Sequence, residues 1–108
     1  YVHVWDIALA HVRAVGFFVN YSPGATQRTS ICLSLNLGTN VGVSNRQIVD
    51  YINYTYGLPF VNYGPNRPGD PAELVADATE ARRLLGWEPV NSNINNIIDS
   101  AYKWYTQN

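Results

Sequence analysis

A chain of 108 residues is long enough for one domain, here residues 1–108. Its formal net charge of −1 argues against a dedicated nucleic-acid binder or a basic membrane-surface protein. No apolar run approaches the ~20 residues of a membrane-spanning helix, and the single Cys32 cannot form an internal disulfide, which favours a reducing, cytoplasmic compartment.

The N-terminal part of the sequence predicts one helix between two strands. The chain opens at Tyr1 without a methionine, which suggests a fragment or the second half of a longer protein. Residues 1–5 are rich in β-forming side chains and predict a short strand. Asp6 then suits the N-cap of a helix over residues 7–18. Residues 31–37, after a loop, alternate in part and predict a mostly buried strand.

The next helix carries clear signals at both ends. Residues 38–44 are rich in glycine and polar side chains, which predicts a tight connection. Ser44 and Gln47 have the spacing of a capping box, so a helix is expected over residues 45–56. Gly57 follows at the position where a helix often ends in a left-handed residue.

Two further helices are predicted toward the end of the chain. Residues 60–63 can form a short strand. Asp77 and Glu80 have the spacing of a second capping box, which predicts a short helix. Ser92 can cap a last helix, about residues 93–106, which carries a wide apolar stripe. The whole pattern is mixed αβ, with short strands and about four helices.

One loop stands out as a candidate ligand site. Residues 63–71 hold three prolines and two glycines, so they form neither a helix nor a central strand. An arginine on a stiff loop suits a phosphate or carboxylate, and Arg67 is in such a place. Asp70 can accept hydrogen bonds from sugar hydroxyls or steady the arginine. The alternative is a surface turn with an incidental ion pair, and from these residues alone it is favoured.

Other reactive side chains give weaker signals. His3 and His11 lack the acidic or thiol neighbours of a metal site. His11 is interpreted as a hydrogen-bonded packing residue, and Cys32 as a small core residue of a buried strand. The three tryptophans are expected to anchor packing: Trp5, Trp87 and Trp104.

Five segments occur in the order of motifs that characterise one family. They are YVHVWD and AHV within residues 1–12, NLGT with a later Gly and Ser within 36–44, RPGD at 67–70, DATEA and LLGWEP within 77–89, and DSAYKWY at 99–105. Over essentially its whole length, the chain resembles the C-terminal portion of UDP-glucose 4-epimerases, which are extended short-chain dehydrogenases/reductases.

The resemblance implies a nucleotide-sugar-binding subdomain of an extended Rossmann-type epimerase. Arg67 takes the place of a family arginine that contacts the UDP diphosphate, and Asp70 that of an aspartate at the nucleoside. Tyr1 matches the tyrosine of an Arg-Asp-Tyr run whose arginine is the second diphosphate contact, which makes Tyr1 a candidate substrate-binding residue. Asn40 replaces a family glycine, which is tolerable because Asn accepts left-handed backbone angles. Leu74 replaces a tyrosine that contacts the ligand in some members.

The family reaction inverts sugar C4 by reversible hydride transfer through bound NAD, and it interconverts UDP-glucose and UDP-galactose in galactose metabolism. The Gly-rich NAD turn and the catalytic Tyr-x-x-x-Lys lie in the family's N-terminal portion. Neither occurs here, because Asp99 rather than a tyrosine lies four residues before Lys103. The chain alone is therefore expected to be an inactive part of an isomerase, without catalytic, cofactor-binding or metal-binding residues.

The expected partners are a UDP-sugar, the N-terminal NAD-binding domain and, as a further option, a second copy in a homodimer. Charged residues make up only 14% of the chain, well below the usual ~25%, so exposed apolar surface is expected where that domain would dock. Two alternatives stay open. One is a related nucleotide-sugar epimerase or dehydratase, and the other is a non-catalytic module that binds a nucleotide diphosphate.

Overall fold

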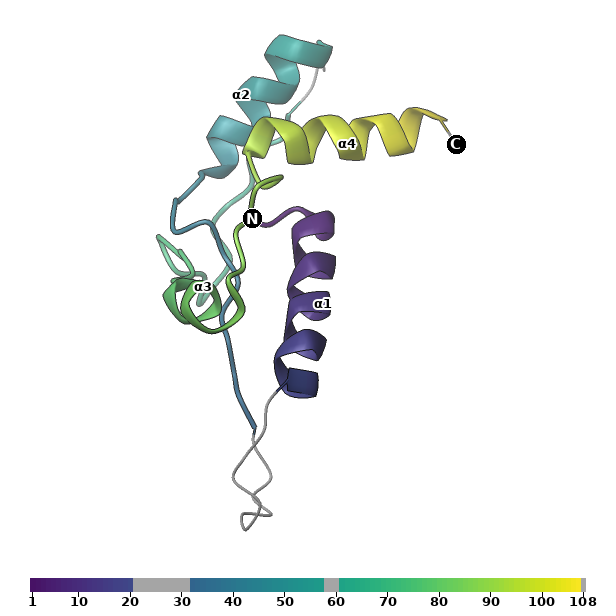
Figure 1. The fold of residues 1–108 in the computed structure, drawn as a ribbon. Helices are drawn as coiled ribbons and strands as arrows, with labels where there is room; N and C mark the ends of the chain where they lie inside the picture. Colours follow the sequence, from purple (N-terminus) through teal and green to yellow (C-terminus); the bar gives the residue numbers. More distant parts are fainter. Residues whose placement is uncertain (21–31, 58–60, 108) are drawn as a thin grey trace.

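The computed structural model describes residues 1–20, 32–57 and 61–107, and these form four helices. In chain order the helices are α1 (Val4–Asn20), α2 (Asn45–Tyr56), α3 (Thr79–Leu85) and α4 (Ile94–Gln107). Helix α1 packs on α3, and α2 packs on α4 (Figure 1). The helices thus form two pairs, joined by long extended segments.

The prediction of a mixed αβ fold is wrong for the part that the structure describes, because no residue in it belongs to a strand. The backbone at 32–39 and 61–67 is neither helical nor paired, and residues 31 and 60 of the predicted strands lie outside the described residues. A strand is stabilised by a hydrogen-bonded neighbour and by burial of one face. The described residues provide no hydrogen-bonded neighbour for either segment, and side chains such as Leu33 and Val61 are exposed.

The predicted strand at residues 1–5 is also wrong, since α1 starts within it. The backbone amides of Asp6 and Ile7 both donate to the carbonyl of His3, at 2.9 and 3.2 Å. Helix α1 therefore begins one turn earlier than the sequence predicts. Consequently Asp6 lies inside the helix and does not cap it.

A small core joins α1 to α3. Its fully or nearly fully buried members are Ala10, Ala78, Ala81 and Trp87, with Val2, Leu35, Leu37 and Leu85 packed against them. The Trp87 indole is completely buried and donates its Nε1–H to the Asp6 carbonyl at 2.8 Å. The expectation for the tryptophans is thus confirmed for Trp87 alone, because Trp5 and Trp104 are 68% and 69% exposed.

The capping signals predict the N-cap of α2 correctly and those of the other three helices incorrectly. In α2 the Gln47 amide donates to the Ser44 hydroxyl at 3.1 Å, the Ser44 amide donates to the Gln47 side chain at 2.8 Å, and Gly57 is left-handed. In α3 the N-cap is Ala78, and Glu80 binds Arg83 instead of closing a capping box.

The last helix is also capped differently from the prediction. The Asn93 side chain accepts from the amide of Asn95 at 2.9 Å, and Ser92 is buried and bonded elsewhere. Ser92 donates to Asp6 and accepts from the amide of His3. Ser92 has the residue type and the position of an N-cap, but its side chain instead connects distant segments of the chain.

The turn at residues 38–42 is fixed by close contact with the segment before α3. A Cβ on Gly38 would lie 2.7 Å from the Cβ of Ala76, so only glycine fits there without displacement. Asn40 has φ 61°, which confirms that asparagine accepts the left-handed backbone of this turn. Its side chain accepts from the amide of Ala78 at 2.9 Å and donates to Asp77 at 3.4 Å.

Among the described residues no helix combines the length and the apolar character that crossing a membrane requires. The radius of gyration is 18.5 Å, against about 13 Å for a compact chain of 100 residues. Several large apolar side chains are exposed on α1, including Val12, Val15 and Val19. This exposed apolar surface agrees with the expectation from the composition.

Candidate functional site

The Arg67 loop is a tight turn that holds its arginine against its aspartate. The amide of Asp70 donates to the carbonyl of Arg67 at 3.2 Å, and Gly69 has φ 85°. Proline at the second position and a left-handed glycine at the third are typical of a type II turn, and the order Arg67-Pro68-Gly69-Asp70 supplies both. The turn therefore follows directly from the sequence of the loop.

The turn brings the two predicted side chains together. Arg67 Nε lies 3.0 Å from Asp70 Oδ2, and the two side chains are 86% and 48% exposed. Within the described part of the chain the Arg67 guanidinium makes no other hydrogen bond. Its remaining N–H groups are consequently available to an anion, while Asp70 restrains the direction of the guanidinium plane.

Tyr1, the third predicted site residue, lies elsewhere. Its hydroxyl donates to the Asn45 side chain at 2.9 Å, at the start of α2. No hydrogen bond or ion pair within the described ranges joins Tyr1 to Arg67 or Asp70. The structure thus brings together two of the three predicted residues.

Tyr1 also lines an apolar groove between α2 and α4. The groove encloses about 320 Å³ and is lined mostly by isoleucine and tyrosine side chains, among them Ile52, Ile98 and Tyr105. Its walls offer almost no polar surface, so the groove suits apolar groups and has no built site for a phosphate or a sugar.

A partly buried hydrogen-bond cluster joins α2 to α4, and the sequence analysis did not predict it. Tyr51 donates to both carboxylate oxygens of Asp99 at 2.9 and 3.0 Å, and Tyr56 donates to Asp99 Oδ1 at 2.5 Å. The hydrogen bond to Asp99, with a smaller contribution from desolvation, raises the pKa of Tyr56 to about 12. The Tyr56 ring also stacks on Tyr102, with centroids 3.7 Å apart. The sequence signal for this cluster was Asp99, a charged residue within the apolar stripe of the last helix.

A second missed cluster surrounds Asp6. Its side chain is fully buried and accepts from the Asn91 amide at 2.9 Å, from Asn91 Nδ2 at 3.2 Å and from the Ser92 hydroxyl at 2.5 Å. Asp6 therefore fastens the first turn of α1 to the segment that leads into α4. The sequence shows an ordinary N-cap candidate, and nothing near it in the chain reveals partners 85 residues away.

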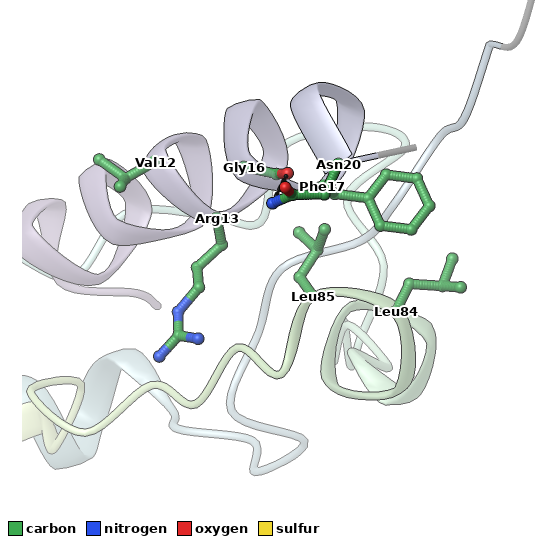
Figure 2. A pocket seen from close by; sticks show the side chains of 7 residues that line it. All are labelled: Val12, Arg13, Gly16, Phe17, Asn20, Leu84 and Leu85. Atoms are coloured by element: carbon green, nitrogen blue, oxygen red, sulfur yellow. Dashed lines mark hydrogen bonds between the residues drawn. The ribbon is translucent and has the colours of Figure 1, made fainter. Parts of the chain in front are cut away.

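A hollow of about 450 Å³ lies between α1 and α3. Figure 2 shows Arg13 extending from α1 toward the segment after α3, with Phe17 and Leu85 on the apolar side. The hollow contains one cationic side chain, no carboxylate and none of the predicted site residues. It carries no group of residues that could perform acid–base chemistry.

The histidines and the cysteine show no metal or nucleophilic arrangement. No group of three or more His, Cys, Asp or Glu side chains in the described ranges could hold a metal ion. His11 Nδ1 is 2.8 Å from the carbonyl of Ile7, so it is hydrogen-bonded as predicted, although it is exposed. Cys32 is exposed, and its interpretation as a core residue is wrong because the contact of this segment with the core is made further along, by Leu35 and Leu37.

Comparison with known proteins gives consistent results. The UDP-glucose 4-epimerase of Lactobacillus helveticus is 37% identical over 106 residues, which are 97% of this chain and 30% of that protein. Those of Rhizobium meliloti and Lacticaseibacillus casei are 36% and 35% identical over 99% and 97% of this chain, and again 30% of the relative. No protein-family model matches the chain. The chain thus spans about 30% of the length of these curated relatives, and the resemblance that its motifs indicate is confirmed: it is similar over nearly all its length to part of the UDP-glucose 4-epimerases.

Proposed function

We propose that these residues form the nucleotide-sugar-binding portion of a UDP-glucose 4-epimerase, and that Arg67 binds the diphosphate of the UDP-sugar. The observation that carries this proposal is the type II turn, which restrains the guanidinium through Asp70 and leaves its other N–H groups available. Phosphate oxygens are suitable acceptors for such a fork. Following the resemblance, we propose that Asp70 lies at the nucleoside, and Tyr1 enters the proposal through the resemblance alone.

The proposed activity of the longer protein is interconversion of UDP-glucose and UDP-galactose with NAD as the hydride carrier. The residues present here do not fit NAD. Gly38 lacks a side chain because Ala76 packs against it, which accounts for a glycine without any bound dinucleotide. We expect NAD to be held by a separate N-terminal domain and assign no step of hydride transfer to this chain.

We also expect the 108-residue chain alone to be inactive. Lys103 has no tyrosine at the preceding catalytic spacing, and Asp99 at that position is bonded to Tyr51 and Tyr56. A coupled assay for UDP-galactose conversion should therefore show no turnover with the pure chain. Clear turnover would contradict this assignment. A cytoplasmic location and a homodimer belong to the same proposal, and fractionation and light scattering would test them.

The binding proposal is tested by ligand-observed NMR with UDP at millimolar concentration, with uridine as a partial ligand and pyrophosphate as a competitor. We expect weak saturation transfer from the chain to UDP, and loss of this signal in Arg67→Ala. Removal of charge-assisted hydrogen bonds worth about 1.5–3 kcal/mol corresponds to roughly a tenfold to hundredfold loss of affinity. Arg67→Lys keeps the charge without the planar fork and should bind at an intermediate level.

Arg46→Ala is the matched control, because Arg46 is another exposed arginine, on α2. Equal binding by Arg67→Ala and the parent chain would remove Arg67 from the site. An equal loss in Arg46→Ala would show that only the overall positive charge matters. UDP binding combined with turnover of other nucleotide sugars by the longer protein would favour a related epimerase or dehydratase, and binding without any turnover would favour the non-catalytic module.

A further inference from the structure

His3 joins three segments through both of its ring nitrogens and its backbone. The amide of Trp5 donates to His3 Nδ1 at 3.0 Å, so the imidazole caps the start of α1. On the other side of the ring, His3 Nε2 lies 2.9 Å from the hydroxyl of Ser100 on α4. The His3 amide donates to Ser92 at 2.9 Å. One side chain thereby connects the N-terminus of α1 to the middle of α4.

Only one protonation state of the ring satisfies all of these contacts. A backbone N–H can only donate, so Nδ1 must be the unprotonated acceptor of the Trp5 amide. The Ser100 hydroxyl donates its own hydrogen to the carbonyl of Ile97 at 2.9 Å. Its oxygen is therefore the acceptor of an Nε2–H, and the ring is the neutral Nε2–H tautomer.

We infer that His3 is a pH-sensitive latch between α1 and α4, which is closed with a neutral ring and opens when the ring takes up a proton. A proton on Nδ1 would face the N–H of Trp5, so the capping hydrogen bond would be lost and two donors would oppose each other. The added positive charge would also lie at the N-terminus of a 17-residue helix, where the helix dipole disfavours cations.

Charged groups of both signs surround the latch. Asp6 in the first turn of α1 attracts a proton to the ring, but its oxygens already accept from Asn91 and Ser92. On α4, Asp99 and Lys103 flank Ser100 with opposite charges, and the segment at 91–92 has no ionisable side chain. The phenol of Tyr1 lies two residues before His3 in the chain.

The direction of the pH dependence follows from the hydrogen bonds. The closed state uses Nδ1 as an acceptor, so protons bind in competition with closure. The contribution of the latch is therefore present at the higher pH values and is lost as the pH falls. Opening of the latch would release the residues ahead of α1, including Tyr1. An effect of this release on UDP binding rests on the proposed function, but the latch itself does not depend on that function.

The test uses nitrogen-resolved NMR of the two imidazoles in the 108-residue chain. His3 and His11 are the only histidines, and the structure assigns them opposite neutral tautomers, because His11 Nδ1 contacts a carbonyl and must donate to it. We expect Nε2–H for His3 and Nδ1–H for His11 at pH 8. As the pH is lowered to 5, protection of the Trp5 amide from hydrogen exchange, corrected for the intrinsic rate, should fall by about fivefold, the scale of one N-cap interaction.

Two variants separate the latch from general acid effects. His3→Asn keeps a side-chain acceptor for the Trp5 amide and cannot titrate, so its protection should be independent of pH. Ser100→Ala removes the link to α4 and leaves the cap, so the pH dependence at Trp5 should persist while the His3 Nε2–H resonance shifts. An Nδ1–H tautomer at His3, or an unchanged pH dependence in His3→Asn, would overturn the inference. Neither outcome depends on UDP binding.

Discussion

Replacement of Asp6 should remove much of the stability of this chain. The buried carboxylate accepts three hydrogen bonds, from the Asn91 backbone, the Asn91 side chain and the Ser92 hydroxyl. A hydrogen bond to a charged group contributes about 1.5–3 kcal/mol, and donors left unpaired in the interior add a desolvation cost. The burial cost of the carboxylate itself is also relieved, so Asp6→Ala should lower the free energy of unfolding by about 3 kcal/mol. That is a large part of the ~5 kcal/mol that a chain of this length with a small core can have.

Asp6→Asn tests the same contact with almost no change of volume. Its amide nitrogen must face either Asn91 Nδ2, which is a donor, or the Asn91 backbone amide and the Ser92 hydroxyl, which both donate to Oδ2 in the parent chain. The first orientation loses the fewest hydrogen bonds, one, so the free energy of unfolding should fall by about 2 kcal/mol. The order of stability is therefore parent chain, Asp6→Asn, Asp6→Ala.

Urea unfolding followed by tryptophan emission measures these changes. Trp87 is fully buried and hydrogen-bonded to the Asp6 carbonyl, so its emission should shift to the red on unfolding. Trp5 and Trp104 are already exposed and contribute a nearly constant background. Asp50→Ala and Asp50→Asn are the controls, because Asp50 is an exposed aspartate on α2. Midpoints for the Asp6 variants equal to those of the Asp50 variants would refute the assignment of Asp6 as a structural link.

Two other predictions concern backbone space and tyrosine ionisation. Gly38→Ala should destabilise the folded chain by about 2 kcal/mol, because the new Cβ would lie 2.7 Å from the Cβ of Ala76. Gly16→Ala is the control in α1: a Cβ there has nothing within 4 Å, so this variant should stabilise the chain by about 0.5–1 kcal/mol. Equal effects of the two substitutions in urea unfolding would contradict the contact between Gly38 and Ala76. Ultraviolet titration should show Tyr56 ionising near pH 12 and, in Asp99→Asn, closer to the ordinary 10. Because the pKa of Tyr56 is raised in the folded chain, its contribution to stability is present below pH 10 and is lost as the pH rises toward 12. A titration unchanged by Asp99→Asn would assign the shift to another cause.

Features that depend on neighbouring residues could be predicted from the sequence. The α2 capping box needs only Ser44 and Gln47, and the structure has both of its hydrogen bonds. The Arg67 turn depends only on its own four residues, so its restrained backbone and its internal ion pair could also be predicted from the sequence.

Features that depend on distant residues could not be predicted in this way. Asp6 and Ser92 both have the side chains of good N-caps, yet they bond to each other across 86 positions. The predicted strands failed for a related reason, because β-propensity describes packing on a sheet and the described residues supply no partner strand. Tyr1 was assigned by resemblance, and its position beside α2 depends on Asn45, which no local pattern identifies.

Asn40 shows how a departure from a family motif can take on a new task. A glycine at this turn would satisfy the left-handed backbone at no cost, but it would offer no side chain to the amide of Ala78. Alanine cannot cap a helix, so the asparagine acts as a cap supplied from 38 residues away. Since a capping side chain at position 78 would accept from amides further along α3 and not from its own, only a neighbouring segment can supply this acceptor, and Asn40 ties the conformation of one turn to the start of another helix.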